Sequence, residues 1–222
     1  MTADHLTTVR RSDLWEWLGQ QLAEPRGAAG RLLGRLMVSL NRVPNRLAVA
    51  VLSPQAGEEI LEVGFGPGDG LAAVLRAAPG CRLSGIDHSG AMASLARRRN
   101  RRIFRGNQPD LRTGSMVELP WADSSFDKIL AVNVAYFFDP EGRAVGELRR
   151  VLKPGGHLVL YVTDRATMLR WRFAGEETHR TYDEQDLRTM LTDGDFPADG
   201  LTLTEVMLPF GMRGWIAVAR LG

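Results

Sequence analysis

The stretch that most limits the possible folds is EEILEVGFGPGDGLAAVL, which covers residues 58–75. An apolar run ends near Glu62, four glycines follow within seven residues, and a helix-like apolar pattern begins after them. A short apolar run bounded by glycine is typical of a buried strand. A strand, a glycine loop and a helix in this order are typical of α/β proteins that bind a ligand at the loop.

The rest of the chain repeats this alternation of strand-like and helix-like segments, which predicts βαβ units and a parallel sheet. We expect strands at 59–64, 81–86, 112–117, 127–133 and 156–162, and helices at 69–78, 90–102 and 140–152. Pro154 and the two glycines after it predict the end of the third helix. A helical stretch at 182–196 and two strands at 201–207 and 214–220 would follow. The predicted fold is a Rossmann-like, doubly wound, mostly parallel seven-stranded sheet with a C-terminal antiparallel hairpin.

The region before residue 56 has a helical pattern and predicts an N-terminal helical extension. Ser12 is a candidate N-cap, and apolar residues share one helix face over 32–40. The segment 1–55 is either a lid over a substrate pocket or a helix pair that packs on the sheet, because one amphipathic face fits both. Residues 56–222 would form the main domain.

Composition and charge favour a folded cytoplasmic protein. Hydrophobic residues make up 44% of the 222 residues and charged residues 24%, and no apolar run approaches a membrane span. The single cysteine, Cys81, forms no internal disulfide, and no metal site is predicted. The basic run 97–105 is interpreted as the solvated end of a helix, since Phe104 is its only aromatic residue. We therefore expect no nucleic-acid partner.

The glycine loop does not fit a dinucleotide or a phosphate. The third glycine of a G-x-G-x-x-G fingerprint would fall at position 69, which is Asp69, and no Gly-Lys-Ser/Thr follows. Glu62 after the first strand and Asp87 after the second suit a nucleoside that carries an amino acid. Glu62 can help to hold an ammonium group, and Asp87 can accept hydrogen bonds from both ribose hydroxyls. The ligand with this chemistry is S-adenosylmethionine.

Four motifs then indicate a family, in this order: LEVGFGPG, SGIDHSGAMASLARRR, LPWADSSFDKILAVNVAYFF and ELRRVLKPGGHLVLY. Over about residues 45–200 the chain resembles the class I S-adenosylmethionine-dependent methyltransferases, especially the ubiquinone/menaquinone-biosynthesis branch. The cofactor-binding residues that the resemblance implies are Glu62, Gly64, Gly66, Gly68, Asp87, His88, Met92 and Asn133. Where many relatives have a Gly-Asp pair that binds adenine, this chain has Gly114-Ser115. A hydroxyl contact from Ser115 and a backbone contact from Met116 are expected in its place.

Methyl transfer from a sulfonium is an in-line displacement that depends on alignment and on excluding water, so a general base is optional. His179 is the candidate base for a hydroxyl acceptor, or else a surface residue. Candidate acceptor contacts, any of which could instead be core residues, are Trp15, Tyr136, Phe137 and Tyr182.

The expected reaction is methylation of a small, partly apolar molecule at O, N or C, with S-adenosylhomocysteine as the second product. DNA methylation is not expected, because NVAY lacks the Pro-Pro motif of amino-directed DNA methyltransferases. The alternatives are a non-catalytic S-adenosylmethionine-binding protein and a nicotinamide-dependent oxidoreductase, which Asp69 opposes. A homodimer is one further option for the assembly.

Overall fold

The computed structural model describes residues 41–169 and 180–222. Its core is a seven-stranded sheet in the order β3-β2-β1-β4-β5-β7-β6. The strands are β1 (Glu59–Val63), β2 (Arg82–Asp87), β3 (Asp110–Thr113), β4 (Phe126–Val132), β5 (Leu152–Thr163), β6 (Leu201–Leu208) and β7 (Met212–Arg220). β1 to β5 are parallel, and β7 is antiparallel to both β5 and β6. The predicted fold and its terminal hairpin are confirmed.

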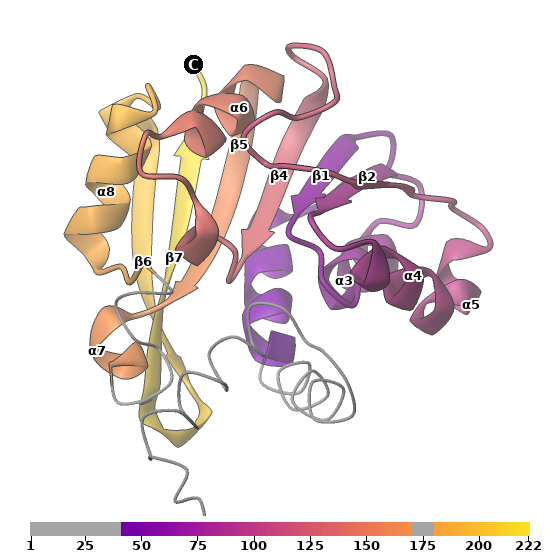
Figure 1. Cartoon of the computed structure of the whole chain (residues 1–222), viewed down its shortest axis with the longest axis horizontal. Coiled ribbons are helices and arrows are strands. Elements are labelled where there is room, and N and C mark those ends of the chain that lie inside the picture. The colour runs from indigo at the N-terminus through magenta and orange to yellow at the C-terminus, as the bar shows by residue number, and fades with distance from the viewer. Residues whose placement is uncertain (1–40, 170–179) are drawn as a thin grey trace, which may run out of the picture.

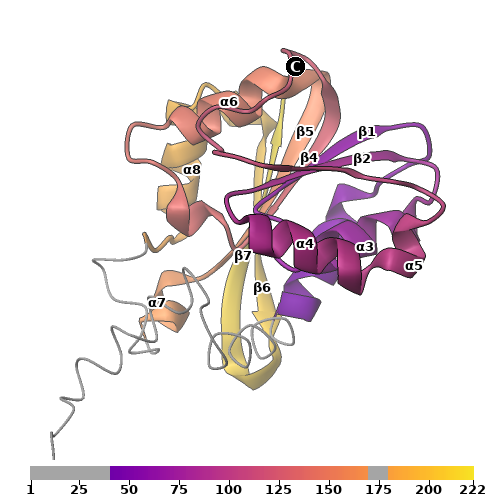
Figure 2. The same cartoon turned by 45° about the vertical axis from the view of Figure 1, so that its right-hand side comes forward.

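Helices cover both faces of the sheet (Figure 1). They are α3 (Asp69–Ala77), α4 (Gly90–Arg99), α5 (Arg101–Phe104), α6 (Arg143–Val151), α7 (Arg165–Met168) and α8 (Glu184–Asp193), with 3₁₀ turns η1 (Ala135–Phe137), η2 (Ala198–Gly200) and η3 (Pro209–Gly211). Figure 2 shows α3, α4 and α5 grouped on one side of the sheet and α6 and α8 on the other. The hairpin of β6 and β7 extends beyond the carboxyl end of β5 (Figure 1).

The central strands are apolar on both sides because both faces are covered. Ile60 and Leu61, neighbours in β1, are fully buried in the two opposite core clusters of the protein. Ser89 begins α4 by accepting a hydrogen bond from the Met92 amide at 3.4 Å, and Asp183 begins α8 with a capping box. These local signals fix the helix starts close to the predicted positions.

Two predicted strand boundaries are wrong. β3 covers Asp110–Thr113 where we expected 112–117, because the chain leaves the sheet once the Gly114 amide donates to the Asp87 carbonyl at 3.0 Å. β5 begins at Leu152, so Pro154 lies inside the strand. An irregularity in the β4–β5 register and a positive φ of 76° at Gly155 accommodate this segment.

The described part of the N-terminal region is a helix over residues 41–52, here called helix 41–52. Its residues Ala48 and Leu52 are fully buried in the same core cluster as Ile60 and Leu71. This part of the region therefore packs on the sheet. The rest of the segment 1–55, with Ser12 and Trp15, lies outside the described residues, so the lid and the division at residue 55 stay predictions.

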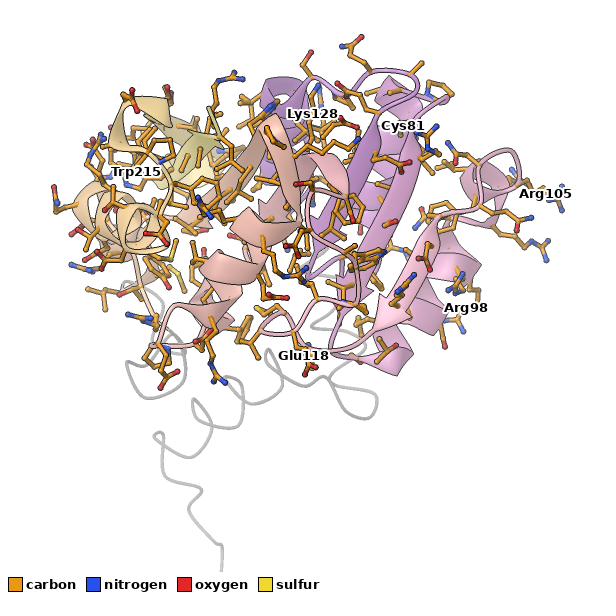
Figure 3. All side chains as sticks on the ribbon, turned by 90° about the horizontal axis from the view of Figure 1, so that it is seen from above. Cys81, Arg98, Arg105, Glu118, Lys128 and Trp215 are labelled. Carbon is orange, nitrogen blue, oxygen red and sulfur yellow. The ribbon has the colours of Figure 1, made fainter. Side chains whose placement is uncertain are left out.

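The basic run ends α4 and forms α5 at the edge of the fold. Arg98 and Arg105 point away from the molecule at this margin, far from Trp215 (Figure 3). Arg97 donates to the Leu111 carbonyl at 2.8 Å, and Arg99 pairs with Asp69 at 3.1 Å. The arginines thus combine solvent exposure with bonds that tie α4 to β3 and α3. Among residues 41–169 and 180–222, no helix is long and apolar enough to cross a bilayer.

Candidate functional site

The candidate site lies at the carboxyl ends of β2, β1 and β4, which are adjacent in the sheet. Asp87 is the last residue of β2, Glu62 is the next-to-last residue of β1, and Asn133 directly follows β4. Parallel strands of an open α/β sheet bind their ligands at this edge. The strand order therefore brings the three predicted polar residues to one side of the sheet.

The glycine loop between β1 and α3 has three left-handed residues, at Gly64, Gly66 and Gly68, with φ of 68°, 48° and 83°. A Cβ on Gly64 would overlap the side chain of Val134, with its Cβ at 2.8 Å. A Cβ on Gly68 would lie 2.7 Å from Asn100 Nδ2, whereas a Cβ on Gly66 would meet nothing within 4 Å. Two of the glycines thus permit close packing, and Gly66 leaves open space above the loop.

Asp87 connects this loop to the second strand. Its Oδ2 accepts a hydrogen bond from the Gly66 amide at 2.8 Å, and its Oδ1 accepts one from the Ser89 amide at 2.9 Å. The side chain of His88 is exposed, with Nδ1 at 3.5 Å from Asp87 Oδ1. Because each carboxylate oxygen has a further lone pair, the fixed carboxylate can still accept from two hydroxyls of a ligand.

Glu62 is a buried acid with an unsatisfied oxygen. Its residue is only 3% exposed, and Oε2 has no hydrogen-bond partner within the described part of the chain. Burial, followed by the negative charges of Asp69 and Asp87, raises the pKa of Glu62 well above its ordinary value, and the Leu71 amide partly opposes this. An ammonium group beside Oε2 would supply both the missing donor and the compensating charge. The chemistry of this buried acid therefore fits the amino-acid end of S-adenosylmethionine.

Asp69 has a structural partner at the start of α3. Both of its carboxylate oxygens accept from Arg99, at 3.1 and 3.2 Å. Asp69 stands where the dinucleotide fingerprint has its third glycine. Its carboxylate lies at the helix N-terminus that would bind a pyrophosphate, and two negative groups repel each other. Its ion pair also ties α3 to α4 beside the glycine loop.

Asn133 occupies a left-handed position with φ of 54° at the end of β4. Its amide donates to the Tyr161 carbonyl at 2.9 Å, and its Nδ2 donates to Asn41 Oδ1 at 2.9 Å. Asn41 was missed from the sequence because it lies in helix 41–52, far from the motif. The sequence feature that could have identified Asn41 is the pair of asparagines at 41 and 45. They lie one helical turn apart, on a helix whose buried positions are mostly apolar.

The other predicted cofactor contacts lie at the margins. Met92 is half-buried in the first turn of α4, and Ser115 is exposed in the loop after β3. The Ser115 hydroxyl accepts a hydrogen bond from the Val117 amide at 3.3 Å, and Met116 packs partly buried against the core. Their contacts to adenine stay predictions.

The aromatic acceptor candidates differ in exposure. Tyr136 and Tyr182 are buried with ring centroids 6.5 Å apart, and burial raises the pKa of both phenols. Tyr136 donates to Asn133 Oδ1 at 2.8 Å, and Tyr182 donates to the Ala135 carbonyl at 2.9 Å. Phe137, in contrast, is 45% exposed. The candidates Trp15 and His179 lie outside the described residues.

A doubly wound sheet with a bare glycine loop between two strand-end acids defines a nucleoside-binding α/β protein. The family described as "Methyltransferase domain" matches residues 61–160. An uncharacterized methyltransferase of Bacillus subtilis is 32% identical over 134 residues, which are 60% of this chain and 72% of the relative. The chain belongs to the class I S-adenosylmethionine-dependent methyltransferases.

One further relative is similar in sequence, and one solved structure is similar in fold. A demethylmenaquinone methyltransferase of Thermus thermophilus is 35% identical over 116 residues, and the match spans 52% of this chain and about half (51%) of that relative. A putative methyltransferase of Haloferax volcanii, solved with a methyltransferase activator, superposes with a TM-score of 0.71 at 18% identity. That likeness covers 92% of this chain and 97% of the other, and it supports the fold alone.

Proposed function

We propose that this methyltransferase transfers the methyl group of S-adenosylmethionine to a small, partly apolar acceptor. The observation that carries the proposal is the buried Oε2 of Glu62, which has no hydrogen-bond partner among the described residues and lies one strand away from Asp87, whose carboxylate is bonded to the Gly66 amide. These groups match an ammonium, a ribose diol and a close backbone approach. When bound, the cofactor supplies a methyl group on a sulfonium, which leaves as a neutral thioether.

In this proposal, the side chains of the protein hold the methyl donor and orient it. In this proposal, Asp87 accepts from the ribose hydroxyls while the Gly66 and Ser89 amides keep its carboxylate fixed. Glu62 takes the ammonium group, and the attraction between the two opposite charges is stronger at this buried position than it would be in water. Fixing both ends of the donor contributes to catalysis by alignment, which suits an in-line displacement.

The acceptor class is inferred from the side chains beside this edge. Phe137 is an exposed aromatic residue in the 3₁₀ turn η1, which follows β4 and Asn133, and Tyr136 and Tyr182 are buried. An exposed aromatic ring favours an acceptor with an apolar body. The demethylmenaquinone methyltransferase among the relatives, whose name specifies a quinone-type acceptor, is consistent with such a molecule.

Calorimetry with S-adenosylhomocysteine tests the donor site. Replacing Asp87 by Ala should weaken binding by roughly 1.5–3 kcal/mol, the usual contribution of hydrogen bonds to a charged group. Asp110→Ala is the matched control, because Asp110 is an exposed acid at the opposite end of β3 that pairs only with Arg112 among the contacts described. Equal affinity of Asp87→Ala and the wild type would remove Asp87 from the site.

A turnover screen tests the acceptor. Phenols, quinols, amines and lipid head groups would be incubated with S-adenosylmethionine, and formation of S-adenosylhomocysteine would be followed. Turnover with an apolar phenol or quinol, lowered by Phe137→Ala, is the expected result. Turnover confined to highly polar amines would contradict the proposed acceptor class.

A further inference from the structure

A chain of hydrogen bonds crosses the carboxyl ends of β5 and β4 and ends on helix 41–52. The Thr163 amide donates to the Tyr136 hydroxyl at 2.6 Å, and that hydroxyl donates to Asn133 Oδ1 at 2.8 Å. Asn133 Nδ2 then donates to Asn41 Oδ1 at 2.9 Å. The hydrogen-bond chain therefore connects three segments that are far apart in the sequence, and its central group is the Asn133 carboxamide.

The direction of this chain is fixed by the backbone. An amide N–H such as that of Thr163 can only donate, so the Tyr136 oxygen must accept from it and direct its own proton elsewhere. The hydroxyl proton of Tyr136 points to Oδ1 of Asn133, and Nδ2 of the same carboxamide donates to Asn41.

The carboxamide lies on the side of the site that would receive the amino-acid end of the donor. In the sheet order, β1 stands between β2 and β4, so Glu62 lies between Asp87 and Asn133. The glycine loop also touches the residue next to Asn133, since a Cβ on Gly64 would lie 2.8 Å from Val134 Cβ. A donor with its ribose at Asp87 and its ammonium at Glu62 therefore has Asn133 beyond its amino-acid end.

Helix 41–52 reaches Glu62 as well. Asn45, one turn after Asn41, donates from Nδ2 to the Asn41 carbonyl at 2.9 Å and is buried. A Cβ on Gly70 would lie 2.7 Å from Glu62 Cδ and 2.9 Å from Asn45 Oδ1, so all three groups crowd one point. The same helix thus bonds to Asn133 through Asn41 and places Asn45 close to Glu62.

We infer that Asn41 is a positioning residue for the methyl donor, acting through Asn133, and that helix 41–52 forms a wall of the donor site. The inference rests on the proposed binding of S-adenosylmethionine. Asn41 accepts from Nδ2 while Tyr136 donates to Oδ1, so both ends of the Asn133 carboxamide are held. Loss of either bond would let this side chain rotate away from the donor.

Calorimetry with two ligands tests the inference. S-adenosylhomocysteine carries the amino-acid end, and 5′-methylthioadenosine lacks it. Asn41→Ala should weaken S-adenosylhomocysteine binding about three- to tenfold, the equivalent of one neutral hydrogen bond, and leave methylthioadenosine binding unchanged. Asp87→Ala should weaken both ligands, because both contain the ribose.

Three further variants distinguish a specific effect on the Asn133 carboxamide from a general disturbance of the structure. Asn41→Asp keeps an accepting oxygen and should retain S-adenosylhomocysteine affinity to within about twofold of the wild type. Arg42→Ala changes the next, exposed residue of the same helix and should have no effect. In a double-mutant cycle, Asn41→Ala and Tyr136→Phe should lose less than the sum of their separate effects, because each releases the same carboxamide.

The outcomes distinguish this inference from the proposed function. Unchanged S-adenosylhomocysteine binding by Asn41→Ala, with weakened binding by Asp87→Ala, would overturn the positioning role and leave the donor site intact. Equal weakening of both ligands by Asn41→Ala would also overturn it, since that result indicates a purely structural effect. Failure of the wild-type protein to bind either ligand would refute the proposed function itself.

Discussion

The sharpest prediction concerns Gly66→Ala. Gly66 has a φ of 48°, where an alanine costs roughly 1–2 kcal/mol of folding free energy. A Cβ there meets no atom of residues 41–169 or 180–222 within 4 Å, so it adds no clash with this part of the protein. The variant should therefore fold, since domains are typically stable by about 5–15 kcal/mol. The new methyl group, however, enters the open space that we assign to the donor, and overpacking of this kind costs about 1–3 kcal/mol of binding.

Urea unfolding and calorimetry with S-adenosylhomocysteine measure the two effects separately. Gly57→Ala is the matched control, because Gly57 also has a positive φ, of 85°, and also has nothing within 4 Å of a Cβ. It precedes β1 at the other end of the strand and should show the same loss of stability with unchanged binding. If Gly66→Ala binds as tightly as Gly57→Ala, the reasoning that places the donor over the loop is refuted.

Other variants probe the buried polar groups and the packing of the loop. The pKa of Glu62 is raised in the folded protein, so the stability that this group provides at low pH is lost as pH rises through that pKa. Glu62→Gln should therefore be more stable than the wild type near neutral pH in urea unfolding, yet bind S-adenosylhomocysteine more weakly; lower stability would contradict this. Gly68→Ala should destabilise the fold by about 2–4 kcal/mol, because the alanine is strained at this φ and its Cβ overlaps Asn100. A melting temperature equal to that of Gly66→Ala would contradict the greater crowding at position 68. His157 has a pKa lowered mainly by burial, so the wild type should lose stability as pH falls below the ordinary value of 6.5, and His157→Gln should flatten that slope.

Much of the fold could be predicted because its signals are local. The glycine loop and the apolar strands β1, β2 and β4 are short local patterns, and each lies within one residue of its predicted position. The β3 boundary failed because Met116 and Val117 are apolar for another reason: they pack on the core from a loop after the strand has ended. Periodicity alone does not distinguish a buried strand from a short apolar loop.

In the candidate site, too, residues with a local sequence signal could be predicted, and long-range contacts could not. Glu62 and Asp87 could be predicted, because each lies at the carboxyl end of its strand and the two strands are neighbours in a parallel sheet. The bond from Asn133 to Asn41 joins residues 92 positions apart, and no local pattern reports such a contact. Tyr136 was identified as a candidate for the acceptor, but its burial and its two hydrogen bonds depend on how β4 and β5 end relative to each other.

The unpartnered oxygen of Glu62 has a consequence for the lifetime of the protein in a cell. A ligand that binds only the folded state adds stability as its concentration rises, by about 2.7 kcal/mol at one hundred times its dissociation constant. Since Glu62 buries an oxygen that has no hydrogen-bond partner among the described residues, we expect the protein without its donor to be the form most exposed to unfolding and proteolysis. The amount of this methyltransferase would then follow the supply of methyl donor, with no separate sensor required.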